Sequence, residues 1–242
     1  MPRALAIHAL ATPFITSLTY AFVTLREDDL KWWKEVLHKD AMRQLGLGLA
    51  LGSAAYLTTT GVATAFGWVH FPSKGWQALS KQEVLETLVS HLGHLAVSWN
   101  EEMLYRGYGL QSLSQAVGKP GAVMILVPLF AWGHAPGLRV LAGQSALGLG
   151  LTSLRLASNS LWLPIGYHAS WNYIQTAILG PPDASPSLLP MYVQGPDLWI
   201  GRPGYPEPGL LSTMINLIVA GGTFWFWWRS SRTALRRAER NE

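Results

Sequence analysis

Three short clusters of polar residues interrupt long apolar stretches of the sequence. Together they supply six residues with reactive or hydrogen-bonding side chains: Glu101, Glu102, Arg106, His134, His168 and Asn172. Carboxylates and imidazoles can activate a water molecule, either directly as a general base or through a bound metal ion. Amide and imidazole N–H groups can donate hydrogen bonds to a developing oxyanion. In apolar surroundings, this set predicts peptide hydrolysis inside a membrane.

The first cluster contains adjacent carboxylates, Glu101 and Glu102, followed by Arg106. Two neighbouring carboxylates cannot both be ionised cheaply in a low dielectric unless a cation neutralises one of them. Arg106 follows Glu102 by four residues, which places both on one helix face and leaves Glu101 without a cation at helical spacing. An ordinary ion pair near the interface would explain Glu102 and Arg106, but it would not require Glu101.

The other two clusters have ordinary interpretations when each is taken alone. A single His on an apolar helix, such as His134, is more often a hydrogen-bonded core residue than a catalyst. The four-residue spacing of His168 and Asn172 puts them on one helix face, where they would also fit hydrogen bonding between helices. Because burying each cluster separately would be costly, we expect all three to surround one polar cavity.

The segments that must position these residues have the composition of an integral membrane protein. Of the 242 residues, 49% are hydrophobic and only 13% are charged, and the charged share is about half of that in soluble domains. Such a composition excludes both a water-soluble globule and a disordered chain. The absence of Cys excludes disulfides, thiol catalysis and thiolate metal sites. We expect residues 1–242 to form a single integral membrane domain, with a motif-bearing core at about 80–180.

Apolar runs of about 18 or more residues can cross the hydrocarbon core of a bilayer. We therefore predict an all-α fold, a polytopic membrane bundle of about seven (six to eight) transmembrane helices. The expected spans are 4–25, 45–70, 84–113, 121–136, 141–158, 161–180 and 209–228. The first is expected to be an uncleaved helix, because its apolar stretch is longer than the core of a signal peptide. In the second, Gly48 and Gly52 have the spacing that lets helices approach closely.

The basic residues predict the orientation of the chain. The loop 26–43 and the tail 229–242 each contain five Lys or Arg residues, and short basic segments favour the cytoplasmic side. Seven spans place both there, with the loop 181–207 outside. The net charge of +4 is thus attributed to topology and to contact with anionic membrane lipids, with no nucleic-acid partner. We expect a multi-pass protein of the bacterial cytoplasmic membrane with a cytoplasmic C-terminus.

Taken together and in order, the clusters resemble a known family. Glu-Glu-x-x-x-Arg at 101–106, Phe-x-x-x-His at 130–134 and His-x-x-x-Asn at 168–172 resemble the three motifs of the CPBP family. These are the CAAX prenyl endopeptidases and bacteriocin-processing proteins, also called the Abi family of intramembrane proteases. The resemblance implies an endopeptidase that hydrolyses a peptide bond of a membrane-associated protein or peptide.

The resemblance also implies a role for each motif residue. Glu101 would activate water with Glu102 and Arg106 as its supporting pair, His134 would help to hold the water, and the residues of the third motif would stabilise the oxyanion. Two His and one Glu also form a recognised zinc ligand set, so Glu101, His134 and His168 would be the ligands if a divalent metal such as zinc is present. The familiar His-Glu-x-x-His helix is absent, and we favour a metal-independent glutamate mechanism.

Two other functions fit parts of the sequence. The same fold could serve as a non-proteolytic membrane scaffold or immunity protein, in which case Glu101→Gln would leave the biological role intact. A proton-coupled transporter would also contain buried Glu and His residues, but the sequence shows no paired halves or inverted repeat. The sequence does not identify the substrate.

Overall fold

The computed structural model describes residues 38–72, 79–182 and 187–238, together with residues 12, 14, 16 and 17. Most of the expected span 4–25 and most of the loop 26–43 lie outside the described residues. The long helices are α3 (Ala41–Ala65), α4 (Lys81–Glu102), α5 (Leu110–Trp132), α6 (Leu138–Ser158), α7 (Trp162–Tyr173) and α9 (Leu210–Ala238). The short elements are the π-helical segments η2 (Met103–Gly109) and η3 (Ile174–Ile178), the helix α8 (Asp197–Ile200), and the strands β1 (Val69–His70) and β2 (Tyr192–Val193).

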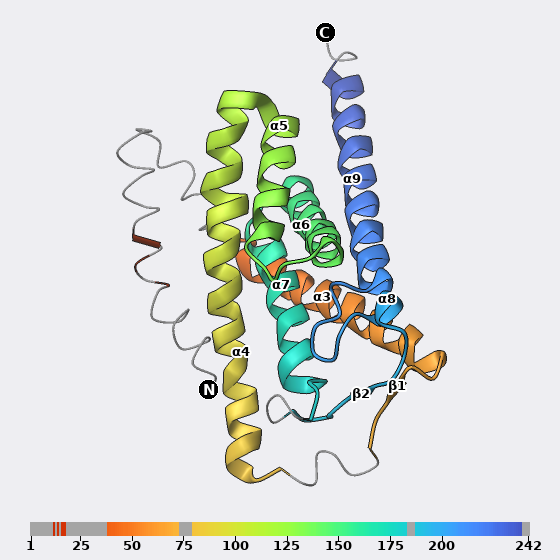
Figure 1. Cartoon of the computed structure of the whole chain (residues 1–242). Helices are drawn as coiled ribbons and strands as arrows, with labels where there is room; N and C mark the ends of the chain where they lie inside the picture. Colours follow the sequence, from red (N-terminus) through yellow and green to blue (C-terminus); the bar gives the residue numbers. More distant parts are fainter. Residues whose placement is uncertain are drawn as a thin grey trace.

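These elements form a helical bundle (Figure 1), so the mainly helical fold is confirmed. By length and composition, three helical runs of the described chain can cross a membrane: Ala41–Ala65, Lys81–Trp132 and Leu210–Arg229. The longest of these contains a reversal of direction, described next. Seven spans remain a prediction, since the described helices do not establish that number.

The chain turns back on itself at Gly118, between the ascending and descending arms of a helical hairpin (Figure 1). Gly118 has φ 74° and ψ 162°, a conformation that side chains with a Cβ rarely adopt. Pro120 follows in the first turn of the descending arm, where its missing N–H leaves no bond unmade. The hairpin brings the end of α5 down beside the middle of the ascending arm.

Close backbone contact joins α3 to α7. A Cβ added at Gly48 would overlap the carbonyl oxygen of Leu163, and one added at Gly52 would overlap that of Tyr167. On the facing helix, a Cβ at Gly166 would overlap the backbone of α3 at Leu45. The close approach expected from the spacing of Gly48 and Gly52 is therefore present, and it fixes the crossing of α7.

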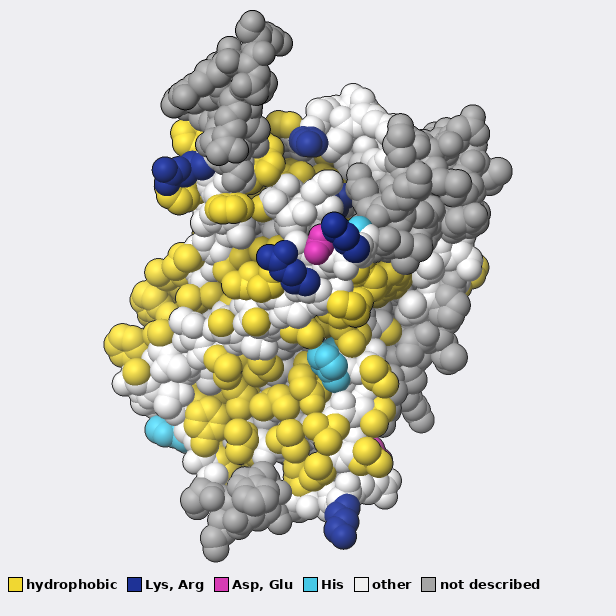
Figure 2. Space-filling model, turned by 180° about the vertical axis from the view of Figure 1, so that it is seen from behind, with side chains coloured by type: hydrophobic (Ala, Val, Ile, Leu, Met, Phe, Trp, Pro, Cys, Tyr) yellow, Lys and Arg dark blue, Asp and Glu magenta, His cyan; other side chains and the backbone are white. Residues whose placement is uncertain are grey.

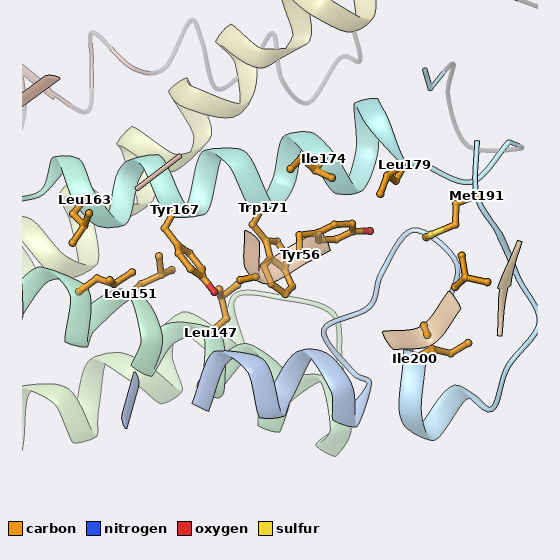
Figure 3. Close-up of a cluster of buried hydrophobic side chains, with 14 of the residues drawn as sticks. Tyr56, Leu147, Leu151, Leu163, Tyr167, Trp171, Ile174, Leu179, Met191 and Ile200 are labelled. Atoms are coloured by element: carbon orange, nitrogen blue, oxygen red, sulfur yellow. The ribbon is translucent and has the colours of Figure 1, made fainter. Parts of the chain in front are cut away.

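Buried aromatic side chains fill the space between α3, α6 and α7. Figure 3 shows Tyr167 and Trp171 of α7 within this cluster, together with Tyr56 of α3 and Leu147 of α6. The Trp171 ring lies edge-on to Tyr56, with 5.2 Å between the ring centroids. The face seen in Figure 2 carries hydrophobic side chains over a broad area, with Lys and Arg mainly in its upper part. Such a surface suits contact with lipid.

Residues 187–209 fold back onto the bundle and form what we call the cap. Strand β2 of the cap pairs with β1 after α3, and Leu188 and Leu189 donate backbone hydrogen bonds to the carbonyls of Ala177 and Ile178. The cap also contains buried side chains, among them Ser187 and Glu207. The segment expected to be an outer loop is thus packed against α7 and η3, although the side of the membrane on which it lies stays a prediction.

Cysteine labelling will test the predicted topology. Ser187 is only 3% exposed, whereas Leu189 is 44% exposed, so Leu189→Cys is the better probe of the cap and Ser231→Cys that of the tail. We expect a membrane-impermeant thiol reagent added outside intact cells to label only Leu189→Cys, because the basic tail should remain in the cytoplasm. The chain has no native Cys, so the unmodified protein is the blank. Labelling of both positions from one side would contradict the orientation.

Candidate active site

The first motif lies at the junction of α4 and η2, in the ascending arm of the hairpin. The helix begins with a capping box in which Ser80 Oγ accepts from the Glu83 N–H and Glu83 Oε2 accepts from the Ser80 N–H. Its last two residues are Glu101 and Glu102, after which the backbone becomes π-helical. A second π-helical segment, η3, directly follows the third motif. Such segments occur frequently at functional sites.

A buried ion pair forms the centre of the site. Arg106 Nη1 donates to Glu102 Oε1 at 3.0 Å, and the two side chains are 2% and 0% exposed. The pair expected from the four-residue spacing is therefore present. Because removing two charges from water is costly, the remaining Arg106 donors also need partners.

Helix α6 supplies those partners. The carbonyl oxygen of Gly148 accepts from Arg106 Nη2 at 3.0 Å, and Thr152 Oγ1 accepts from Nε at 3.3 Å. A Cβ added at Gly148 would lie 3.2 Å from Nη2, so the missing side chain makes room for the guanidinium. On the other side, the Phe130 ring centroid lies 4.3 Å from the guanidinium carbon, a cation–π geometry.

His168 of α7 connects the two carboxylates. Its Nδ1 lies 3.0 Å from Glu102 Oε1, and its Nε2 lies 3.9 Å from Glu101 Oε2. The Glu101 side chain is 26% exposed, unlike the fully buried Glu102. Among the described residues, neither Glu101 Oε2 nor Glu102 Oε2 has a hydrogen-bond partner. Two buried carboxylate oxygens that await a donor mark a place where a water molecule can bind.

His134 lies beside this network and contacts it through Phe130. Its Nδ1 lies 2.8 Å from the carbonyl oxygen of Phe130, and its ring centroid is 4.9 Å from that of Phe130. The Phe130 centroid is in turn 6.2 Å from that of His168. His134 is half-buried and lies two residues after the end of the descending arm at Trp132, so the hairpin brings the second motif to the level of the first.

Asn172 lies one helical turn after His168, on the same face of α7. Its backbone oxygen accepts from Thr176 Oγ1, and this hydroxyl lies 2.8 Å from Nε2 of His94 on α4. The structure thus links Glu101, Glu102, Arg106 and His168 in one network, with His134 against Phe130 and Asn172 one helical turn from His168. A single polar cavity shared by all of them stays a prediction.

The residues proposed as metal ligands do not form a ligand set. In the parts of the chain that are described, no three His, Asp or Glu side chains are placed to hold a metal ion together. Glu101, His134 and His168 therefore do not fit a zinc site in this arrangement.

The segment that contains the site matches a known protein family. Residues 83–174 match the family model described as type II CAAX prenyl endopeptidase Rce1-like. The chain carries an Rce1-like domain. All three motifs lie inside it, so the resemblance to the CAAX prenyl endopeptidases noted in the motifs is confirmed. No curated protein and no solved structure matches the chain.

At the level of the family, the Rce1-like domain supports a CAAX-protease-like intramembrane endopeptidase. Its apolar helices support an integral membrane protein. Helix α3, the whole cap and α9 lie outside the matched residues.

Sequence reasoning missed several residues that support the site. Gly148 and Thr152 lie on α6, between the second and third motifs, and they hold the Arg106 guanidinium. A small residue and a hydroxyl four positions apart are common in membrane helices, so their spacing alone would not have identified them. Glu207 of the cap was missed as well, because a single acid in a loop has no spacing to a partner.

Proposed function

We propose that the chain is an intramembrane endopeptidase in which Glu101 activates the attacking water. The observation that carries this proposal is the contrast between the two carboxylates. Glu102 is fully buried and holds Arg106 and His168, whereas the Glu101 side chain is partly exposed and its Oε2 has no hydrogen-bond partner among the described residues. A partly exposed carboxylate with one oxygen free of hydrogen bonds, beside a fixed and charged network, is suited to accept a proton from water.

The other groups would act on the reaction's developing charge. As water attacks the peptide carbonyl, its proton passes to Glu101, and negative charge grows on the carbonyl oxygen. His168 and Asn172 share a face of α7 and would donate hydrogen bonds to that oxygen. His168 would donate from Nε2 in its doubly protonated form, because Nδ1–H is engaged with Glu102. His134 would help to hold the water from the descending arm.

Arg106 would act as a positioning residue, since Glu102, Gly148 and Thr152 engage its guanidinium. It fixes Glu102, and Glu102 fixes the orientation of the His168 ring. The substrate would be a membrane-associated protein or peptide, because the site lies in a helical hairpin apolar enough to cross a bilayer.

Comparing the termini of cellular proteins will test this function. Cells that make the unmodified chain should contain new N- or C-termini in their membrane fraction that are missing from cells that make Glu101→Gln. Mass spectrometry of enriched terminal peptides measures the difference, with both proteins at the same level in the membrane. If no terminus depends on Glu101 while both versions fulfil the same cellular role, the chain acts as a scaffold.

A further inference from the structure

A third carboxylate lies buried near the site, on a segment that the proposed mechanism does not use. Glu207 belongs to the cap, yet it is only 3% exposed. Its Oε1 accepts from Trp171 Nε1 at 2.9 Å, and its Oε2 lies 3.5 Å from Gln175 Nε2. Both donors come from α7 and η3.

The partners of Glu207 lie on the face of the helix that carries the third motif. Trp171 follows His168 by three residues and Gln175 follows it by seven, a spacing that aligns all three along one side of a helix. The Trp171 indole is fully buried and stacks on Tyr167, with 6.3 Å between the centroids. A displacement of Trp171 would therefore displace the turn that holds His168.

The cap holds Glu207 in place through contacts of its own. Gln175 Nε2 donates to the carbonyl of Gly204, and Ser212 Oγ donates to the carbonyl of Pro206. A Cβ added at Gly143 of α6 would overlap the carbonyl oxygen of Glu207, so the backbone of the cap lies directly against α6. Glu207 is thus a fixed acceptor between α6 and α7.

We propose that Glu207 is a positioning residue that holds α7 through Trp171, so that His168 and Asn172 keep their places opposite Glu101 and Glu102. We call Glu207, Trp171 and Gln175 the cap clamp. Glu207 accepts hydrogen bonds on the side of α7 where the cap packs, and Glu102 contacts His168 from α4. The helix with the third motif is thereby held by contacts from both the cap and α4. The kinetic part of this inference rests on the proposed hydrolysis.

Two measurements on the full chain in lipid nanodiscs test the clamp. For Glu207→Ala, we expect kcat to fall about 10- to 100-fold, the effect of a small misplacement of catalytic groups, with KM changed by less than about twofold. Amide hydrogen exchange in peptides covering 162–178 should rise by about fivefold, as expected for the loss of one net hydrogen bond. Trp171→Phe should give the same two effects, and the double variant should be no worse than either single variant.

Two further variants separate positioning from other roles. Glu207→Gln keeps an oxygen acceptor for Trp171 and should restore both measurements to near those of the unmodified chain. Tyr205→Phe removes a different anchor of the cap, the hydroxyl that accepts from Gln144 Nε2 at 3.3 Å, and should change neither measurement.

The outcomes distinguish the possibilities. Faster exchange with unchanged kcat in Glu207→Ala would show a purely structural contact and overturn the proposal. A fall in kcat without faster exchange, or an equal fall in Glu207→Gln, would show that Glu207 acts through its charge and would also overturn it. If the unmodified chain hydrolyses nothing, the proposed function fails, and the exchange measurement alone decides whether the clamp exists.

Discussion

Glu101→Gln is expected to lower the rate of peptide hydrolysis by at least about 100-fold, the lower end of what a general base contributes. The fold should be unchanged, because the amide fills the same space and the Glu101 side chain is partly exposed. The residual rate would come from the oxyanion donors, which remain in place. Single-turnover cleavage of a membrane-reconstituted substrate, together with thermal unfolding, measures both effects.

Glu102→Gln is the matched control for this substitution, since it changes the neighbouring carboxylate in the same way. It would leave the buried Arg106 without its counterion and is therefore expected to lose stability as well as activity. Substantial turnover by well-folded Glu101→Gln would contradict the assignment. If Glu102→Gln were instead the stable and inactive variant, the roles of the two glutamates would have to be exchanged.

Arg106→Ala is expected to destabilise the fold by about 3–5 kcal/mol and to abolish hydrolysis, because it leaves Glu102 as an uncompensated buried charge. The substitution also removes the donors to Gly148 and Thr152 and the contact with the Phe130 ring. The free energy of unfolding in a denaturant titration measures the loss. Activity should fall even at temperatures where the variant is folded, because Glu102, which orients the His168 ring, loses the cation that holds it in place.

Thr152→Val provides a graded control for Arg106→Ala. It removes one hydrogen bond to the guanidinium at nearly constant volume and should cost about 1 kcal/mol, leaving the ion pair intact. An Arg106→Ala variant as stable as the unmodified chain would show that the pair is not buried as the structure has it. A larger loss from Thr152→Val than from Arg106→Ala would point to the same conclusion.

Local spacing was sufficient to predict the contacts that a single helix makes. Glu102 and Arg106 are one turn apart, and their pairing follows from helix geometry without knowledge of the tertiary fold. Gly48 and Gly52 indicated a close helix approach for a similar reason, although the partner helix, α7, could not be named from their spacing.

Contacts between distant segments could not be predicted in this way. If every span crossed the membrane straight, Glu101 would lie towards the cytoplasmic side and His134 near the outer end of its helix. The two residues would then be too far apart in depth to share one site. Their relative depth depends on where the long arm begins and where the chain turns. In the structure, the turn at Gly118 returns the chain alongside the ascending arm, so that the two residues lie at a similar level. The burial of Glu207 depends on the packing of the cap against α6 and α7, and nothing in the sequence around an isolated acid specifies that packing.

The lengths of the two arms of the Gly118 hairpin determine how the first and second motifs are placed relative to each other. Glu101 lies 17 residues before the glycine and His134 lies 16 residues after it, so the two arms are nearly equal in length. A helix rises about 1.5 Å and rotates about 100° per residue. An insertion of one residue in a single arm would shift one motif along the axis and turn it away from the other. Length changes in homologous chains should therefore occur outside the interval from Glu101 to His134, or in both arms together. The number of residues on each side of Gly118 thus sets the relative positions of Glu101 and His134 along the hairpin.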